Sequence, residues 1–154
     1  MLNLEKYYFQ EAIREAESAF KEGEVPVGCV IVKDGEIIAK GHNRVESLND
    51  PTAHAEIIAI GSAGEKLKNW RLTGCTMYVT LEPCLMCTGA LILSRIDKVV
   101  YLVEDPKFGT FESQLQIDDL FKFNHKFEVQ KYEDPELQEK VKNLMQSFFK
   151  SLRK

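Results

Sequence analysis

The chain has 154 residues, of which 44% are hydrophobic and 29% charged, a balance typical of a folded globular domain and not of a disordered chain. At this length we expect a single domain over residues 1–154, with a core that is stable without disulfides. No run of about 18 apolar residues is present, which argues against a membrane span, and the N-terminus lacks the pattern of a secretory signal. We therefore expect a cytoplasmic protein whose four cysteines stay reduced.

The net charge of −4 is unevenly distributed along the chain. The residues before Lys140 include 15 basic and 24 acidic side chains, whereas residues 140–154 include five basic and no acidic ones. The acidic body argues against broad, non-specific nucleic-acid binding. The basic end leaves two interpretations open: a local contact with a phosphate backbone, or a solvated helix face rich in lysine.

Hydrophobic spacing in the first half predicts a helix that begins near Leu4 and ends at Gly23. Apolar runs at 27–32 and 37–39 predict two strands, and Asp34-Gly35 between them predicts a tight hairpin. Asp50-Pro51 has the residues of a helix start, so we expect a helix from there through Ile60.

The second half alternates strands with helices. We expect strands at 75–80 and 98–103, a short helix opened by Pro83, a loop at 104–114, a last strand near 126–130 and a closing helix from Asp134-Pro135. This alternation predicts an α/β fold. Because the first hairpin is antiparallel, we expect a three-layer α/β/α sandwich with a central mixed five-stranded sheet.

Two short segments carry the residue types of a metal site: His54-Ala55-Glu56 and Pro83-Cys84-Leu85-Met86-Cys87. Cysteines three residues apart at a helix start share one face and sit at the positive end of the helix dipole, which favours thiolates. His54, Cys84 and Cys87 would give a Zn²⁺ ion three ligands and leave the fourth position to water, the arrangement of a catalytic site. Glu56 is then the nearby proton acceptor.

Other interpretations of the two segments are weaker. A lone Cys-x-x-Cys also occurs in redox-active dithiols and in structural zinc knuckles, but a knuckle needs a fourth ligand and a dithiol needs no His-x-Glu. Cys29 and Cys75 lie in expected strands and are interpreted as buried thiols. A zinc-stabilised RNA-binding module without catalysis has no use for Glu56.

The order His-x-Glu followed by Pro-Cys-x-x-Cys is the signature of zinc nucleobase deaminases. The sequence resembles the cytidine-deaminase superfamily and, more closely, the bacterial tRNA-specific adenosine deaminases. The resemblance covers nearly the whole chain. The closer match is carried by Glu24-Val25-Pro26-Val27-Gly28, Asn43-Arg44, Asp50-Pro51-Thr52-Ala53-His54-Ala55-Glu56, Tyr78-Val79-Thr80-Leu81-Glu82-Pro83-Cys84, Ser94-Arg95-Ile96, Asp105-Pro106-Lys107, Asn124-His125 and Phe148-Phe149.

The resemblance implies hydrolytic deamination of adenosine to inosine at the wobble position of a tRNA anticodon. It implies one zinc ion per chain on His54, Cys84 and Cys87, with Glu56 as the catalytic proton shuttle. By the same match, the residues that line the base pocket are Asn43, Pro26, Val27 and the backbone of Ala55, and those that contact the anticodon are Asp105 and Lys107. It further implies a homodimer.

The loop after the strand at 98–103 departs from the family pattern of small residues. Phe108 and Phe111 introduce aromatic rings that suit stacking on single-stranded RNA. Glu104 and Glu112 introduce acids that would repel phosphates. The alternative substrate is therefore a free nucleobase or nucleoside of the guanine, cytosine or adenosine type, with the same chemistry.

Overall fold

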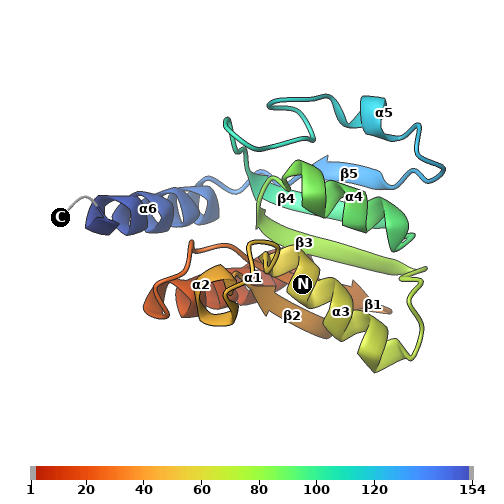
Figure 1. The fold of residues 1–154 in the computed structure, drawn as a ribbon, viewed down its shortest axis with the longest axis horizontal. Helices are drawn as coiled ribbons and strands as arrows, with labels where there is room; N and C mark the ends of the chain where they lie inside the picture. The colour runs from red at the N-terminus through yellow and green to blue at the C-terminus, as the bar shows by residue number, and fades with distance from the viewer. Residues whose placement is uncertain (1–2, 153–154) are drawn as a thin grey trace.

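The computed structural model describes residues 3–152 and contains one five-stranded sheet (Figure 1). β1 runs antiparallel to both β2 and β3, whereas β3, β4 and β5 are parallel. The predicted mixed sheet is confirmed. Its spatial order is β2-β1-β3-β4-β5, with β1 at Gly28–Lys33, β2 at Glu36–His42, β3 at Cys75–Leu81, β4 at Lys98–Val103 and β5 at Glu128–Lys131.

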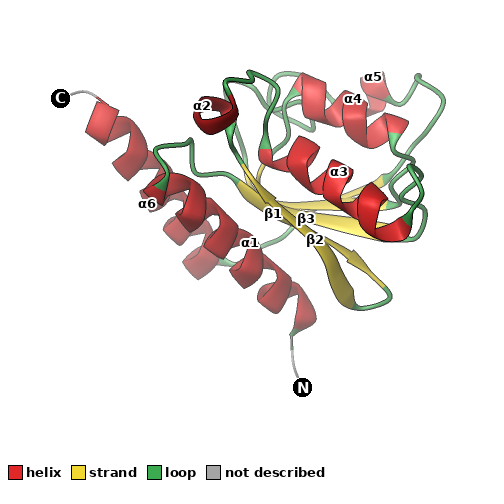
Figure 2. Cartoon of the chain, turned by 60° about the horizontal axis from the view of Figure 1, so that its bottom comes forward, coloured by secondary structure: helices red, strands yellow, loops and turns green. Residues whose placement is uncertain are grey.

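Helices cover both faces of this sheet. Figure 2 shows α1 (Leu4–Lys21) and α6 (Pro135–Leu152) on one face, and α3 (Ala55–Leu67) and α4 (Leu85–Leu93) on the other. The three-layer sandwich expected from the alternation of elements is therefore confirmed. Within residues 3–152, no helix has both the length and the apolar character needed to cross a membrane.

Each face of the sheet has its own hydrophobic core, because neighbouring side chains of a strand point to opposite sides. In β1, Val30 and Val32 pack with residues of α1, whereas Cys29 and Ile31 pack with residues of α3. β3 divides in the same way, with Tyr78 on the α1 side. The strands are thus apolar on both faces, as in sheets covered by helices.

Two glycines lie where a positive φ or a close backbone approach favours glycine. Gly35 completes the predicted hairpin, in which Asp34 and Gly35 both have positive φ, at 51° and 79°, as a type I′ turn requires. Gly41 in β2 lies directly under α3, where a Cβ would overlap the carbonyl oxygen of Ala55 and the amide nitrogen of Ala59. This close approach fixes the position of the first turn of α3 above the sheet.

Several predicted boundaries were wrong. The helix expected from Asp50-Pro51 begins at Ala55, because the Asp50 carboxylate accepts hydrogen bonds from the N–H and the hydroxyl of Thr52 and forms a turn instead. Pro83 likewise precedes α4, whose N-cap is Cys84. The last strand begins two residues later and ends one residue later than expected. Two four-residue helices, α2 at Val45–Leu48 and α5 at Ile117–Leu120, are too short to show a hydrophobic period and were not predicted.

Candidate metal centre and active site

The three candidate metal ligands lie at the N-termini of two neighbouring helices. His54 is the N-cap of α3 and Cys84 is the N-cap of α4; both have extended backbones, and neither side chain caps its own helix. Cys87 lies in the first turn of α4 and is buried. The Nδ1 atom of His54 is 3.6 Å from the Sγ atom of each cysteine, and the three ligand atoms all lie within 4.8 Å of one another.

These distances fit a tetrahedral divalent ion. With Zn–S bonds of about 2.3 Å and a Zn–N bond of about 2.0–2.1 Å, tetrahedral angles place the nitrogen and each sulfur about 3.6 Å apart. The observed distances from His54 to Cys84 and Cys87 agree with this value. The donor set of one imidazole and two thiols is also the chemistry that zinc prefers, so the residues present fit the ion.

Proton sharing between the two sulfurs shows why this group suits a cation. The hydrogen bond with Cys87 lowers the pKa of Cys84 to about 4, and the neighbouring His54 lowers it further against the effect of burial. The same hydrogen bond, together with burial, raises the pKa of the Cys87 thiol well above its ordinary value. Without a cation only Cys84 is ionised, and a positive charge between the sulfurs is what would allow both to be thiolates.

Glu56 is buried beside the ligands but does not belong to the ligand group. Desolvation by burial raises the pKa of this carboxyl to about 7; the negative Cys84 adds to the effect, and a backbone hydrogen bond and His54 oppose it. Glu56 and His54 can face one centre although they are two residues apart, because His54 has left the helix with a ψ of 157°. A carboxyl that exchanges protons near neutral pH is suited to general acid–base chemistry.

Asn43 connects the start of α3 to the end of β2. Its Oδ1 atom accepts a hydrogen bond from the backbone N–H of Ala55 at 2.7 Å, and its own backbone N–H donates to the carbonyl of Val27. The Asn43 side chain therefore caps α3 from outside the helix, next to His54 and Glu56. Four of the predicted substrate-pocket residues, Pro26, Val27, Asn43 and Ala55, are all buried, and these two hydrogen bonds join the last three.

The other two predicted substrate contacts lie in the loop after β4. The Oδ1 atom of Asp105 accepts hydrogen bonds from the N–H groups of Lys107 and Phe108, so one oxygen of this carboxylate stabilises its own turn. Lys107 is exposed. The two aromatic rings of the loop differ: Phe111 is buried in the core on Tyr101, whereas Phe108 is 65% exposed.

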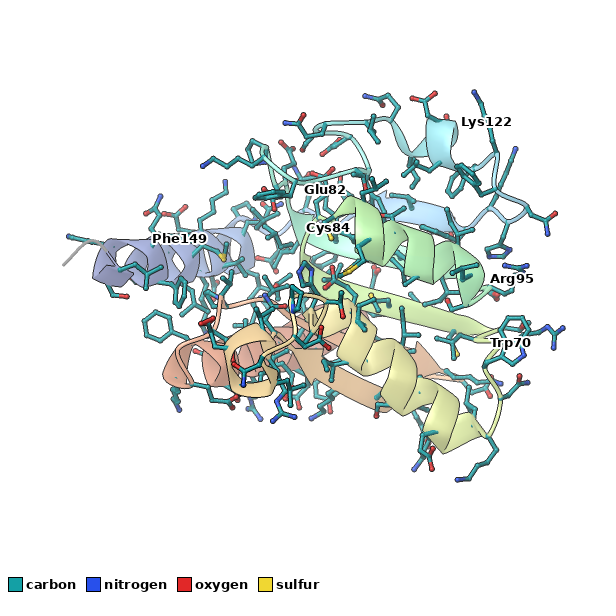
Figure 3. All side chains as sticks on the ribbon, viewed as in Figure 1. Trp70, Glu82, Cys84, Arg95, Lys122 and Phe149 are labelled. Carbon is teal, nitrogen blue, oxygen red and sulfur yellow. The ribbon has the colours of Figure 1, made fainter. Side chains whose placement is uncertain are left out.

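Glu82 is a residue near the site for which the sequence suggested no role. It is buried, directly precedes Pro83 and Cys84 in the sequence, and accepts hydrogen bonds from the loop that contains Asp105. Figure 3 shows Glu82 near Cys84. Those hydrogen bonds outweigh the effect of burial and lower the pKa of the Glu82 carboxyl. The available signal was an acid placed between an apolar strand and a proline, which does not reveal its partners.

Glu24 is a second buried carboxylate that binds backbone N–H groups, in this case those of α2. It is 1% exposed, and its carboxylate accepts hydrogen bonds from the N–H groups of Glu46 and Ser47 and from the Ser47 hydroxyl. This carboxylate therefore caps α2 from outside the helix. The histidine before Asn43 is also tied to this region, since His42 lies between the carboxylates of Glu15 and Glu22.

Comparison with known proteins agrees with this fold and site. Residues 3–153 match the family model of the MafB19-like deaminases, so the chain is a deaminase-class protein. A tRNA-specific adenosine deaminase from Aquifex aeolicus is 50% identical over 148 residues, which cover 96% of this chain and 95% of that protein. The chain belongs to the tRNA-specific adenosine deaminase family.

Two solved structures are similar to this chain in both fold and sequence. One, from a study of tRNA:A34 deaminases that edit the wobble position, has a TM-score of 0.79 and 42% identity, covering 82% of this chain and 98% of that one. The other, a guanine deaminase from Bacillus subtilis, has a TM-score of 0.64 and 31% identity, covering 93% of both chains. The same fold therefore occurs with different named substrates.

The Asn43 cap gives a stability prediction. Asn43→Ala leaves the buried N–H of Ala55 without its acceptor, and we expect the free energy of unfolding to fall by about 1–3 kcal/mol. Asn43→Asp keeps an acceptor and adds a charge that a helix N-terminus favours, so it should retain most of that stability. Urea denaturation followed by circular dichroism measures both variants; an Asn43→Ala midpoint equal to that of the unchanged protein contradicts the capping role.

Proposed function

We propose that the protein deaminates adenosine to inosine at the wobble position of a tRNA anticodon, in a zinc-dependent hydrolysis. The observation that carries the proposal is the conjunction of a His-Cys-Cys group at ligand spacing with 50% identity to a tRNA-specific adenosine deaminase over nearly the whole chain. The reaction consumes one water and releases ammonia, with no oxidation or reduction.

His54, Cys84 and Cys87 would hold the zinc ion. When bound there, zinc would supply a water molecule activated for attack on C6 of the base. Glu56 takes a proton from the attacking water, delivers it to N1 of the adenine ring and later gives a proton to the departing ammonia. Its burial supports this role, because a carboxyl with a pKa of about 7 can both accept and donate a proton at neutral pH.

The residues assigned to substrate binding form two groups, one buried and one in the loop after β4. Asn43, Pro26, Val27 and the backbone of Ala55 are assigned to the base pocket, and Asp105 and Lys107 to the RNA. While its Oδ1 atom accepts from Ala55, the Asn43 side chain still offers the N–H donors of its Nδ2 atom to a substrate. The acidic Glu104, which would repel RNA, is paired with Lys131, which reduces that repulsion.

A homodimer is the second part of the proposal. The outer surface of α4 has no charged residue, and Leu85 and Leu93 on it are 57% and 69% exposed. An apolar helix surface of this kind suits burial against a second copy of the chain.

We expect zinc at about one ion per chain in the purified protein, because three protein ligands define one site. Cys84→Ala and Cys87→Ala should each lose most of the metal, since two remaining ligands hold zinc poorly. Cys75→Ala is the matched control: its sulfur is buried in β3 and lies outside the ligand group, so its metal content should not change. Elemental analysis of the four proteins decides; equal zinc in all of them would remove the ligand assignment.

The substrate is tested by measuring ammonia release from an anticodon stem–loop with a wobble adenosine, free adenosine, guanine and cytosine. We expect turnover of the stem–loop only. Glu56→Gln should bind zinc but lose about 10²–10⁴-fold in kcat, the usual contribution of a general acid–base group. Turnover of a free base alone would replace tRNA by the alternative substrate class, and an active Glu56→Gln variant would reassign the proton shuttle.

The dimer is tested by sedimentation of the purified protein at micromolar concentration, where we expect twice the chain mass of 17.6 kDa. Leu93→Glu should shift the protein to a monomer, because it puts a charge into the buried contact. Leu4→Glu is the control, an exposed leucine on α1 at the other side of the sheet. A monomer before any substitution would contradict the proposal.

A further inference from the structure

The loop over residues 105–113 is held by one buried carboxylate. Glu82 is 2% exposed and accepts hydrogen bonds from the backbone N–H groups of Asp105, Phe111, Glu112 and Ser113 at 2.8–3.1 Å, and another from the Ser113 hydroxyl. Among the described residues, no lysine, arginine or histidine lies within ion-pair distance of it. The charge of Glu82 is therefore balanced by the loop itself.

The loop also packs directly on this carboxyl group. A Cβ atom on Gly109 would overlap the Glu82 carboxyl carbon and both of its oxygens, so only glycine fits there. Beside it, the N–H and hydroxyl of Thr110 donate to the carbonyl of Pro83, and the same hydroxyl lies 2.9 Å from that of Thr88 in α4. The loop is thus attached to the segment that carries Cys84.

The energetics favour one loop conformation. A buried carboxylate is costly unless it is fully hydrogen-bonded, and bonds to an ionised acceptor are about twice as strong as neutral ones. Opening the loop would break all five bonds to Glu82 together. This ordering precedes any contact with a substrate, so binding does not have to supply it.

The outer side of the ordered loop presents a cation and an aromatic ring. Lys107 is exposed, Phe108 is 65% exposed, and the Asp105 carboxylate fixes the turn that carries both. A positive charge beside an exposed ring is the pattern that binds single-stranded nucleic acid, through a phosphate and a stacked base.

We propose that Glu82 is a positioning residue, which holds the loop over residues 105–113 in the conformation that presents Lys107 and Phe108 to the single-stranded RNA beside the edited base. This inference rests on the proposed function, since it takes RNA as the substrate. Glu82 itself touches neither the reacting atoms nor the RNA.

The test compares three variants at steady state on the anticodon stem–loop: Glu82→Gln, Gly109→Ala and the double substitution. Gln puts an NH₂ group and no charge opposite the loop donors, and Ala puts a methyl group where the carboxyl lies. Both single variants should raise KM by about tenfold or more, because several charge-assisted hydrogen bonds order the loop. We expect kcat to stay within about threefold, because the ligands and Glu56 remain in place.

Two further measurements separate loop positioning from a general loss of structure. Zinc content should stay at the level of the unchanged protein, and hydrogen exchange should accelerate at residues 105–113 only. The double variant should have the same KM as the single variants, because both release the same loop and their effects do not add. Glu36→Gln, at an exposed acid in the first hairpin, is the matched control and should change nothing.

The outcomes distinguish this inference from the proposed function. If the unchanged protein does not deaminate the stem–loop, the proposed function has failed. If it does, an unchanged KM in Glu82→Gln overturns the positioning role, as does metal loss in proportion to activity. Should Glu82→Gln not fold, Gly109→Ala decides alone: a raised KM with full zinc supports the proposal, and an unchanged KM overturns it.

Discussion

The site depends on how closely the start of α3 approaches the sheet. Gly41 leaves room for the backbone of α3 to lie on β2, and Asn43, two residues further on, accepts the first free N–H of that helix. Gly41 in β2 and Asn43 just after β2 thus fix the position of the first turn of α3. His54 can then leave the helical path and approach Cys84 and Cys87, while Glu56 remains inside the first turn. Each of the two helix starts is held from outside its own helix: Asn43 binds the start of α3, and Thr110 binds the carbonyl of Pro83 just before α4.

Two segments beside the centre, α2 and the loop over residues 105–113, are each held by hydrogen bonds to a buried carboxylate. Glu24 holds α2, and Glu82 holds the loop over residues 105–113. α2 has no buried residue of its own, whereas the loop also packs Phe111 into the core on Tyr101. Hydrogen bonds from backbone N–H groups to an ionised oxygen have defined directions, so they set the conformation of these two segments.

The sequence allowed the prediction of those features whose signals are local. Asp34-Gly35 predicted the hairpin, and apolar spacing predicted the N-terminal helix, because turn chemistry and helical period act within a few residues. His54, Cys84 and Cys87 were found from their residue types and spacing. The partners of Asn43, Glu24 and Glu82 could not be predicted, because each accepts from backbone groups 12 to 31 residues away, and a backbone N–H has no residue signature. The sequence also could not show that Phe108 is exposed and Phe111 is buried, since this depends on which ring reaches the core.

In the proposed function, substrate choice depends on residues other than the zinc ligands. A guanine deaminase from Bacillus subtilis shares this fold at a TM-score of 0.64, so the fold alone does not select the base. The Oδ1 atom of Asn43 accepts from Ala55, and the Nδ2 atom of the same side chain offers N–H donors beside the proposed centre. A donor at that point favours a ligand that presents an acceptor there, whichever ring it carries. Under the proposed function, discrimination between a free base and RNA falls to contacts beyond the base, where the loop presents the exposed Lys107 and Phe108.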